Sequence, residues 1–237
     1  MHETLFPIIM IIGNSVSVYN VKMPMYYSRI LNILDTIQKK SCFLFGPRSI
    51  GKTTLIKSKL PNALYFDLLD ADVFYKLARH PKYIAETIQG SNQIIVIDEI
   101  QKMPQILNEV HRIIENSGNH FLLTGSSART LRRKGVNLLG GRAWQMELFP
   151  FVSKEIKDFD LMYYLNRGGI PSVYLSENPS QDLKHYVNLY IKEEIVAEAL
   201  SRRIDYFARF LEIMALNNGE ELSYQSLASD AGVPVRT

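Results

Sequence analysis

Residues 46–53 read GPRSIGKT, and this stretch decides the fold. It matches the phosphate-binding consensus G-x-x-x-x-G-K-S/T at every position. The apolar residues 42–45 before it indicate a buried strand, and the residues from 52 to 59 after it follow a helical pattern that Pro61 ends. A strand, a glycine-rich loop and a helix in this order are the context in which the consensus binds phosphate.

The chemistry of the loop follows from its residue types. Glycine permits backbone conformations closed to other residues, so that successive N–H groups and the start of the helix point at an anion. We expect Lys52 to act on the β- and γ-phosphates of ATP and Thr53 to bind Mg²⁺ through its hydroxyl. The residues expected to contact the nucleotide are Gly46, Pro47, Arg48, Ser49, Ile50, Gly51, Lys52, Thr53 and Thr54.

A second strand ends in two carboxylates. Residues 94–99 read IIVIDE, and Asp98 fits the role of a magnesium ligand that acts through the ion's waters. Glu99 beside it is placed to orient or deprotonate the water that attacks the γ-phosphate, which makes it the expected catalytic base. The alternative is a polar end to a buried strand where the chain reaches the surface.

Two further segments supply polar groups. Residues 121–127 (FLLTGSS) form a strand that ends in hydroxyls, where Thr124 or Ser126 is suited to sensing the γ-phosphate. The alternative is that Ser126 or Ser127 caps the start of a helix. Residues 139–142 (LGGR) place Arg142 after flexible backbone, where it can neutralise charge in the transition state in cis or in trans. The alternative for Arg142 is a surface arginine with no catalytic role.

Apolar runs and helical patterns alternate through the first part of the chain, which predicts an α/β fold with a parallel sheet and helices on both faces. After Pro150 the patterns are helical only. The expected strands are 42–45, 63–68, 93–97, 121–124 and 144–148, and the expected helices are 25–39, 52–59, 71–77, 105–116, 127–134, 153–159, 161–166, 181–200, 204–216 and 223–231.

Composition narrows the function classes. The 237 residues are 46% hydrophobic and carry a formal net charge of +3, too small a bias to indicate a nucleic-acid partner by itself. A single cysteine, Cys42, excludes an intrachain disulfide and favours a reducing compartment, so we expect a cytoplasmic protein. The apolar run 5–12 is far shorter than the roughly 20 residues of a membrane span and is expected to be a strand or a disordered tail.

The motifs GPRSIGKT, IIVIDEIQKMP, FLLTGSS, LGGR and GGIP occur in this order, and from about residue 25 onward the chain resembles prokaryotic AAA-like ATPases with an AAA_14-type core and a DUF4143 C-terminal region. The resemblance implies a P-loop NTPase sheet of the additional-strand type, with strand order 5-1-4-3-2. It also implies nucleotide, magnesium and catalytic roles for Lys52, Thr53, Asp98 and Glu99, and a winged helix that begins near residue 223. Because the chain ends at Thr237, we expect that winged helix to be incomplete.

We therefore expect an N-terminal extension (1–24), a P-loop ATPase domain (25–150), a helical segment (151–203) and an incomplete winged helix (204–237). The leading hypothesis is an Mg²⁺-dependent ATPase that drives a conformational change in its C-terminal region, as a homo-oligomer if Arg142 acts in trans. One alternative is a P-loop phosphotransferase in which Arg129, Arg132 and Arg133 clamp the donor phosphates. Another is a nucleotide switch with little hydrolysis that binds DNA or a protein partner through its C-terminal helices.

Overall fold

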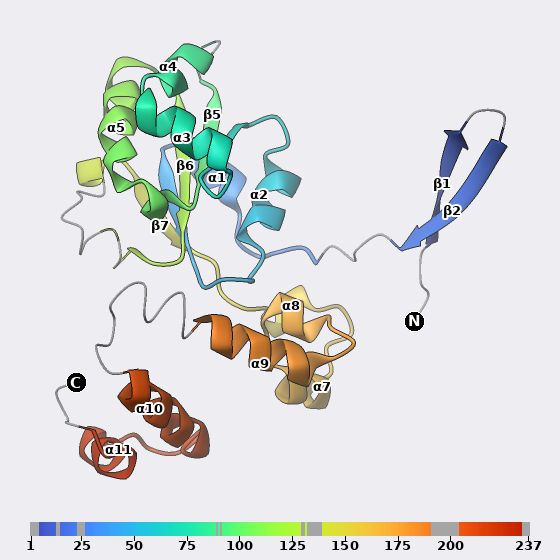
Figure 1. Cartoon of the computed structure of the whole chain (residues 1–237), viewed down its shortest axis with the longest axis vertical. Helices are drawn as coiled ribbons and strands as arrows, with labels where there is room; N and C mark the ends of the chain where they lie inside the picture. The colour runs from blue at the N-terminus through green and yellow to red at the C-terminus, as the bar shows by residue number, and fades with distance from the viewer. Residues whose placement is uncertain are drawn as a thin grey trace.

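A computed structural model of the chain describes residues 5–12, 15–22, 27–88, 90, 92–128, 131, 139–190 and 204–233. Its centre is a five-stranded parallel sheet in the order β4-β5-β6-β3-β7 (Figure 1). Read from the β7 edge and numbered from β3, this order is 5-1-4-3-2, which confirms the predicted fold class. The strands are β3 (Cys42–Phe45), β4 (Leu64–Asp67), β5 (Ile94–Asp98), β6 (His120–Gly125) and β7 (Trp144–Glu147).

Alternate side chains of the strands enter two separate cores. Phe43 and Phe45 of β3 pack in one core with the buried faces of α3 (Ala71–Arg79), α4 (Tyr83–Thr87) and α5 (Leu107–Asn116). Cys42 and Leu44 pack in the other core with α1 (Ile33–Ile37) and α2 (Lys52–Lys59). Helices therefore cover both faces of the sheet, as the alternation of strands and helices predicted (Figure 1).

The strands begin and end within one residue of their predicted positions, and α2 has its predicted bounds. Sequence patterns missed α4 and the short helix α8 (Pro171–Tyr174), and also two single turns of 3₁₀ helix, η1 (Ile100–Lys102) and η3 (Leu139–Gly141). Two further turns, η2 (Pro104–Ile106) and η4 (Ser153–Glu155), overlap the predicted helices 105–116 and 153–159.

The predicted helix over 25–39 is too long at both ends, because within residues 27–39 only Ile33–Ile37 are helical. The Asn32 side chain caps this helix by accepting a hydrogen bond from the Asp35 amide at 3.4 Å. The Ile30 amide donates instead to Glu155 Oε1 at 2.9 Å, a partner 125 residues away. The predicted helix over 153–159 shrinks to η4, and Asp158 beyond it takes a positive φ of 52°, which no helix continues.

Helices follow the sheet, as predicted: α7 (Leu161–Arg167), α8, α9 (Pro179–Tyr190), α10 (Ile204–Leu216) and α11 (Tyr224–Ala231). Phe151, Ile156 and Tyr174 form a small core to which Tyr27 and Tyr164 contribute. Residues 191–200 of the predicted 181–200 helix, and most of the 127–134 helix, lie outside the described residues.

Residues 5–12 and 15–22 form two antiparallel strands. Strand β1 (Leu5–Ile12) pairs with β2 (Ser15–Lys22) so that Leu5 lies opposite Lys22 and Ile12 opposite Ser15. This confirms the strand alternative for residues 5–12, although its partner strand was not predicted. Among the described helices, none combines the length and the apolar character that a bilayer crossing requires.

Candidate functional site

Parallel strands bring the predicted site residues to one edge of the sheet. The carboxyl end of β3 leads into residues 46–51, β5 ends at Asp98 and β6 ends at Gly125. Because β6 pairs with both β3 and β5, the ends of these three strands are neighbours. Residues that are up to 80 positions apart in the sequence therefore meet beside the phosphate-binding loop.

The loop runs in conformations that glycine permits. Gly46 has a φ of 154°, and a Cβ there would lie 2.4 Å from the Leu148 carbonyl oxygen and 2.4 Å from Ile50 Cδ1. Gly51 has a φ of 87° and caps the start of α2, while Ser49 takes a φ of 60°. The two consensus positions therefore require glycine for different reasons. At Gly46 the Leu148 carbonyl leaves no room for a Cβ, and at Gly51 the backbone is left-handed.

The lysine of the motif turns back over the loop. Lys52 is 7% exposed, and its ammonium donates to the carbonyl oxygens of Gly46 at 2.8 Å and Pro47 at 3.1 Å. These two carbonyls satisfy a positive charge that burial would otherwise penalise. The ammonium therefore lies at the loop where the motif predicts phosphate binding.

Asp98 is the centre of a buried polar cluster. It is 4% exposed, and its Oδ2 accepts hydrogen bonds from Thr53 Oγ1 at 3.0 Å and from the Tyr65 hydroxyl. Its Oδ1 accepts from Thr124 Oγ1. The structure thus brings together Thr53 and Asp98, the two predicted magnesium ligands, and adds two hydroxyls that orient the carboxylate.

Sequence reasoning missed Tyr65. It lies in β4, where it pairs with Val96 of β5, and burial together with its hydrogen bond to Asp98 raises the pKa of its hydroxyl. The available signal was a phenol group in the short apolar strand that neighbours the strand ending in Asp98. That signal needs the order of the strands, which a single strand pattern does not contain.

Glu99 has a strained backbone. Its φ of 60° and ψ of 45° lie in the left-handed region, which is unfavourable for a residue with a Cβ. Its amide donates to Thr124 Oγ1 at 3.2 Å, and its carboxylate accepts from Gln101 Nε2. Strain held in place by such contacts is common where a side chain is presented for function.

Electrostatics distinguish Glu99 from an ordinary surface carboxylate. Burial raises the pKa of Glu99 above its usual value, and the neighbouring Asp98 raises it further, whereas Lys52 and Arg48 oppose the rise. A carboxylate with a raised pKa is a better proton acceptor near neutral pH than an exposed one. The position and the basicity of this group therefore suit proton abstraction from water.

Thr124 connects the two carboxylate residues. It is fully buried, donates to Asp98 and accepts from the Glu99 amide. At the next position, a Cβ on Gly125 would lie 2.8 Å from Gln101 Oε1, so the end of β6 packs closely against η1. Thr124 is thus part of the polar cluster around Asp98.

The structure does not bring Arg142 to this cluster. Arg142 precedes β7, at the amino edge of the sheet, whereas the loop lies at the carboxyl edge. Its guanidinium donates to Glu115 Oε1 at 2.6 Å, and it borders a polar hollow with Lys39, Ser41 and Asn119. Within one chain, Arg142 is therefore far from the predicted chemistry.

The phosphotransferase alternative depended on Arg129, Arg132 and Arg133, and these three residues lie outside the described residues.

Family comparisons agree with this geometry. The AAA domain family matches residues 38–157, slightly more than half of the chain, and a domain of unknown function, DUF8612, matches residues 158–237. The second match replaces the predicted DUF4143 region. No match was found among curated proteins.

Comparison with solved structures gives matches that include the Aeropyrum pernix ORC1 protein in complex with DNA, with 16% sequence identity over 81% of this chain and 59% of that chain and a TM-score of 0.34. Drosophila ORC bound to DNA matches with 13% identity over 74% of this chain and 51% of that chain and a TM-score of 0.35. A signal transduction ATPase with numerous domains and a tetratricopeptide repeat sensor, from Pyrococcus horikoshii, also matches. Its sequence identity is 18% over 84% of this chain and 31% of that chain, and the TM-score is 0.35. This chain spans between 31% and 59% of the length of these structures.

Proposed function

Because the chain belongs to the AAA domain family through residues 38–157, we propose that it is an Mg²⁺-dependent ATPase in which Glu99 activates water for attack on ATP. The observation that carries the proposal is the cluster of Thr53, Asp98 and Glu99 beside the phosphate-binding loop. A metal ligand pair, a proton acceptor and a loop lysine are the parts that hydrolysis of a nucleoside triphosphate requires.

The donor atoms suit magnesium. Thr53 Oγ1 and Asp98 Oδ2 are hard oxygen donors 3.0 Å apart. The described residues contain no group of three or more His, Cys, Asp or Glu side chains at metal-binding distance. Mg²⁺ commonly takes one or two protein ligands and fills the remaining positions with water and phosphate oxygens. When bound there, the ion would neutralise charge on the β- and γ-phosphate oxygens.

The chain's own residues then have separate tasks. Lys52 exchanges its carbonyl partners at Gly46 and Pro47 for phosphate oxygens, to which a buried ammonium binds more strongly. Glu99 accepts a proton from the attacking water. Thr124 orients the Asp98 carboxylate and the Glu99 backbone by donating to Asp98 and accepting from the Glu99 amide.

The test is phosphate release from ATP with Mg²⁺, measured beside nucleotide binding in the same samples. Glu99→Gln should keep binding and lower turnover by about a hundredfold or more, because it removes the general base. The matched control is Glu86→Gln, which alters a carboxylate that is 56% exposed on α4 and should leave turnover unchanged. Equal turnover in wild type and Glu99→Gln would refute the proposed role, and binding without release in the wild type would favour the nucleotide switch.

Arg142 can contribute to the same reaction only from a second copy of the chain. We propose that it does so in an oligomer, since its pair with Glu115 is exposed and contributes at most about 1 kcal/mol to stability. Arg142→Ala and Lys52→Ala should each lack turnover, and a mixture of the two should regain part of it. Full turnover by Arg142→Ala alone would exclude a catalytic role for this arginine.

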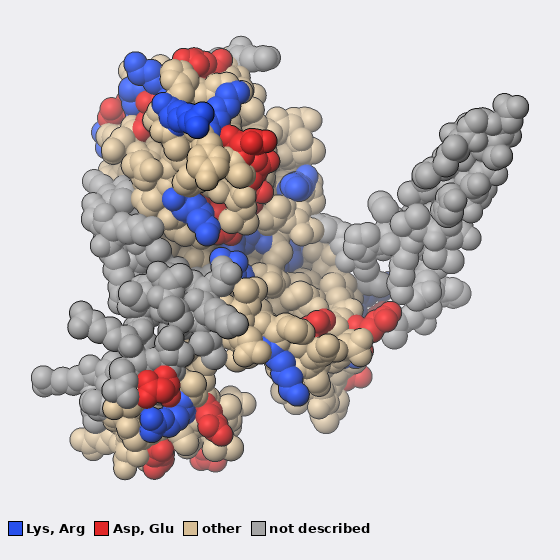
Figure 2. All heavy atoms as spheres, in the orientation of Figure 1, with Lys and Arg blue, Asp and Glu red and all other residues tan. Residues whose placement is uncertain are grey.

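The C-terminal region is the part that hydrolysis is proposed to move, and DNA or a protein is its proposed partner. On the face drawn in Figure 2, the described Lys and Arg side chains are interspersed with Asp and Glu side chains, so the described residues form no broad basic surface there. Duplex binding that weakens steeply with salt would support the DNA version, because phosphate contacts release counterions. Binding that salt does not affect would count against it.

A further inference from the structure

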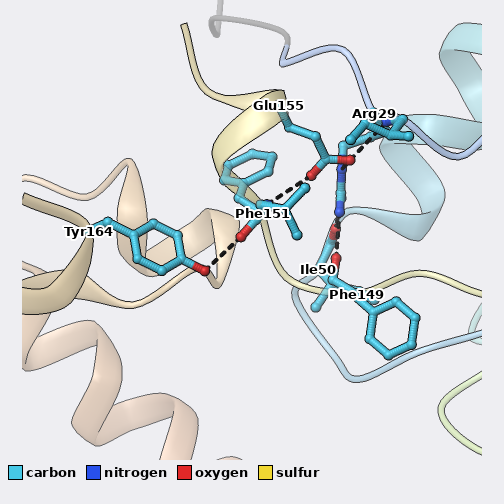
Figure 3. Close-up of polar contacts among 8 residues, drawn as sticks. Arg29, Ile50, Phe149, Phe151, Glu155 and Tyr164 are labelled. Atoms are coloured by element: carbon cyan, nitrogen blue, oxygen red, sulfur yellow. Dashed lines mark hydrogen bonds and ion pairs between the residues drawn. The ribbon is translucent and has the colours of Figure 1, made fainter. Parts of the chain in front are cut away.

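A buried arginine lies behind the phosphate-binding loop. The side chain of Arg29 is 6% exposed, and that of Glu155, its ion-pair partner, is 5% exposed (Figure 3). Arg29 donates from Nε to Glu155 Oε1 at 3.0 Å, from Nη1 to the Ile50 carbonyl at 2.7 Å, and from Nη2 to the Phe149 carbonyl. One guanidinium therefore joins the segment before α1, the loop and the segment after β7.

The bond to Ile50 has a consequence for phosphate binding. A peptide unit is planar and trans, so its C=O and the following N–H point in opposite directions. By holding the Ile50 carbonyl, Arg29 also fixes the direction of the Gly51 N–H at the start of α2. A charged donor on the carbonyl also polarises the peptide unit and makes its N–H a stronger donor.

The other two bonds lead to the C-terminal helices. Glu155 also accepts from the amides of Ile30 at 2.9 Å and Val152 at 3.2 Å, which ties residues 149–155 to the arginine. Phe151 within this segment donates from its amide to the Gly169 carbonyl at 2.7 Å, and its carbonyl accepts from the Tyr164 hydroxyl at 2.7 Å. The segment is thus bonded to α7 and to the turn before α8 (Figure 3).

We infer that Arg29 is a positioning residue that aligns the Gly51 N–H for a bound phosphate and couples the loop to residues 149–155. The inference rests on the proposed nucleotide binding. A shift of the loop on nucleotide binding moves the Ile50 carbonyl, and Arg29 passes that movement to Glu155 and Phe149. Water does not readily replace the ion pair, because both partners are buried.

Three variants separate the two functions of the arginine. Arg29→Lys keeps the charge but offers a single ammonium, which cannot reproduce the fork that bonds three acceptors. Arg29→Met removes every bond while keeping the volume. Glu155→Gln breaks the ion pair and leaves the Ile50 bond in place. The control is Arg112→Met, which alters an arginine that is 49% exposed and paired with Glu109 on α5.

The experiment measures Mg²⁺-ATP affinity and turnover, together with hydrogen exchange at the Phe151 amide with and without nucleotide, in variants whose folding is verified by thermal unfolding. We expect nucleotide to change exchange at Phe151 in the wild type and in Arg112→Met. Arg29→Lys and Arg29→Met should bind nucleotide about tenfold more weakly, or worse, and lose the change at Phe151, since a small displacement of a positioning group has effects of this size. Glu155→Gln should bind within about threefold of the wild type and still lose the change at Phe151.

That split between affinity and coupling is not expected if Arg29 and Glu155 only stabilise the fold. Arg29→Lys with wild-type affinity and an unchanged response at Phe151 would overturn the inference while leaving the proposed ATPase intact. If Arg29→Met does not fold, Arg29→Lys and Glu155→Gln still decide the matter. A wild-type chain that binds no nucleotide would overturn the proposed function and this inference with it.

Discussion

Replacing Gly46 by alanine is the substitution whose effect follows most directly from the geometry of the loop. The added Cβ would lie 2.4 Å from the Leu148 carbonyl oxygen, well inside van der Waals contact. The peptide units on both sides of that carbonyl are held, because the Leu148 amide donates to the Phe45 carbonyl at 2.8 Å and the Phe149 carbonyl accepts from Arg29 Nη2. These two bonds restrict rotation of the Leu148 carbonyl. The loop itself must therefore move, and the site moves with it.

Two terms set the size of the effect. A φ of 154° is unfavourable for a residue with a side chain, and such strain amounts to about 1–3 kcal/mol. Overpacking of a rigid site adds about 1–3 kcal/mol. We therefore expect Gly46→Ala to lower the free energy of unfolding by about 2–6 kcal/mol. With a urea dependence of about 3 kcal/mol per molar, the unfolding midpoint should fall by about 0.7–2 M.

Urea unfolding followed by circular dichroism measures this directly, with Gly141→Ala as the control. Gly141 also has a positive φ, 81°, but no heavy atom lies within 4 Å of a Cβ built there. The control therefore carries the backbone strain without the overlap. The difference between the two variants isolates the overlap, and Gly46→Ala should also lose nucleotide binding. If both variants lose equal stability, or Gly46→Ala binds nucleotide normally, the reasoning about the loop is refuted.

Three further predictions concern the carboxylate cluster. Turnover should rise with pH through a midpoint above the ordinary Glu pKa of 4.5, since Glu99 must be ionised to accept a proton. Because the pKa of Glu99 is raised in the folded state, its contribution to stability is complete below the unfolded-state pKa and should be lost as the pH rises through the folded-state pKa. Glu99→Gln should abolish both pH effects. Thr124→Val should lower the free energy of unfolding by about 2–6 kcal/mol, because Asp98 and the Glu99 amide both lose a buried partner, and a loss below 0.5 kcal/mol in urea unfolding would contradict this. Tyr65→Phe should raise the Mg²⁺ concentration for half-maximal turnover by about 10–100-fold, because it removes an orienting hydroxyl from Asp98, and an unchanged magnesium titration would contradict that role.

The sequence predicted the phosphate-binding loop and its neighbours well because the motif constrains local structure on both sides. The strand before the loop and the helix after it have their predicted bounds. The approach of Asp98 to Thr53 was also predictable, since parallel strands end at the same edge and the motif identifies which edge matters. Local patterns and strand direction were sufficient for these features.

Arg29 shows what local patterns do not contain. The apolar spacing of residues 30–37 resembles a helix, and it led to a helix prediction that includes Arg29. The structure instead holds the segment before Ile33 through Glu155, whose carboxylate is distant in sequence. Tyr65 was missed for the same reason, because its partner Asp98 lies on the neighbouring strand.

Arg142 shows a second limit. Its sequence position after two glycines suggested freedom to reach phosphate, but the register of β7 places it at the amino edge of the sheet. The predicted parallel sheet already implied this position, because a residue that precedes a parallel strand lies at the opposite edge from a loop that follows one. The LGGR motif was interpreted without regard to the strand after it. The DUF4143 region was expected from a resemblance whose motifs lie almost entirely in the first domain, and only GGIP falls within residues 158–237, which match DUF8612 instead.

The most direct test of the account is to identify the nucleotide that stays on the protein after incubation with Mg²⁺ and ATP. The chain is separated from free nucleotide, denatured and analysed by chromatography. The account predicts ADP on the wild type and intact ATP on Glu99→Gln, because binding needs the loop whereas cleavage needs the carboxylate. ADP on both proteins would contradict the role of Glu99, and no nucleotide on either would contradict the site.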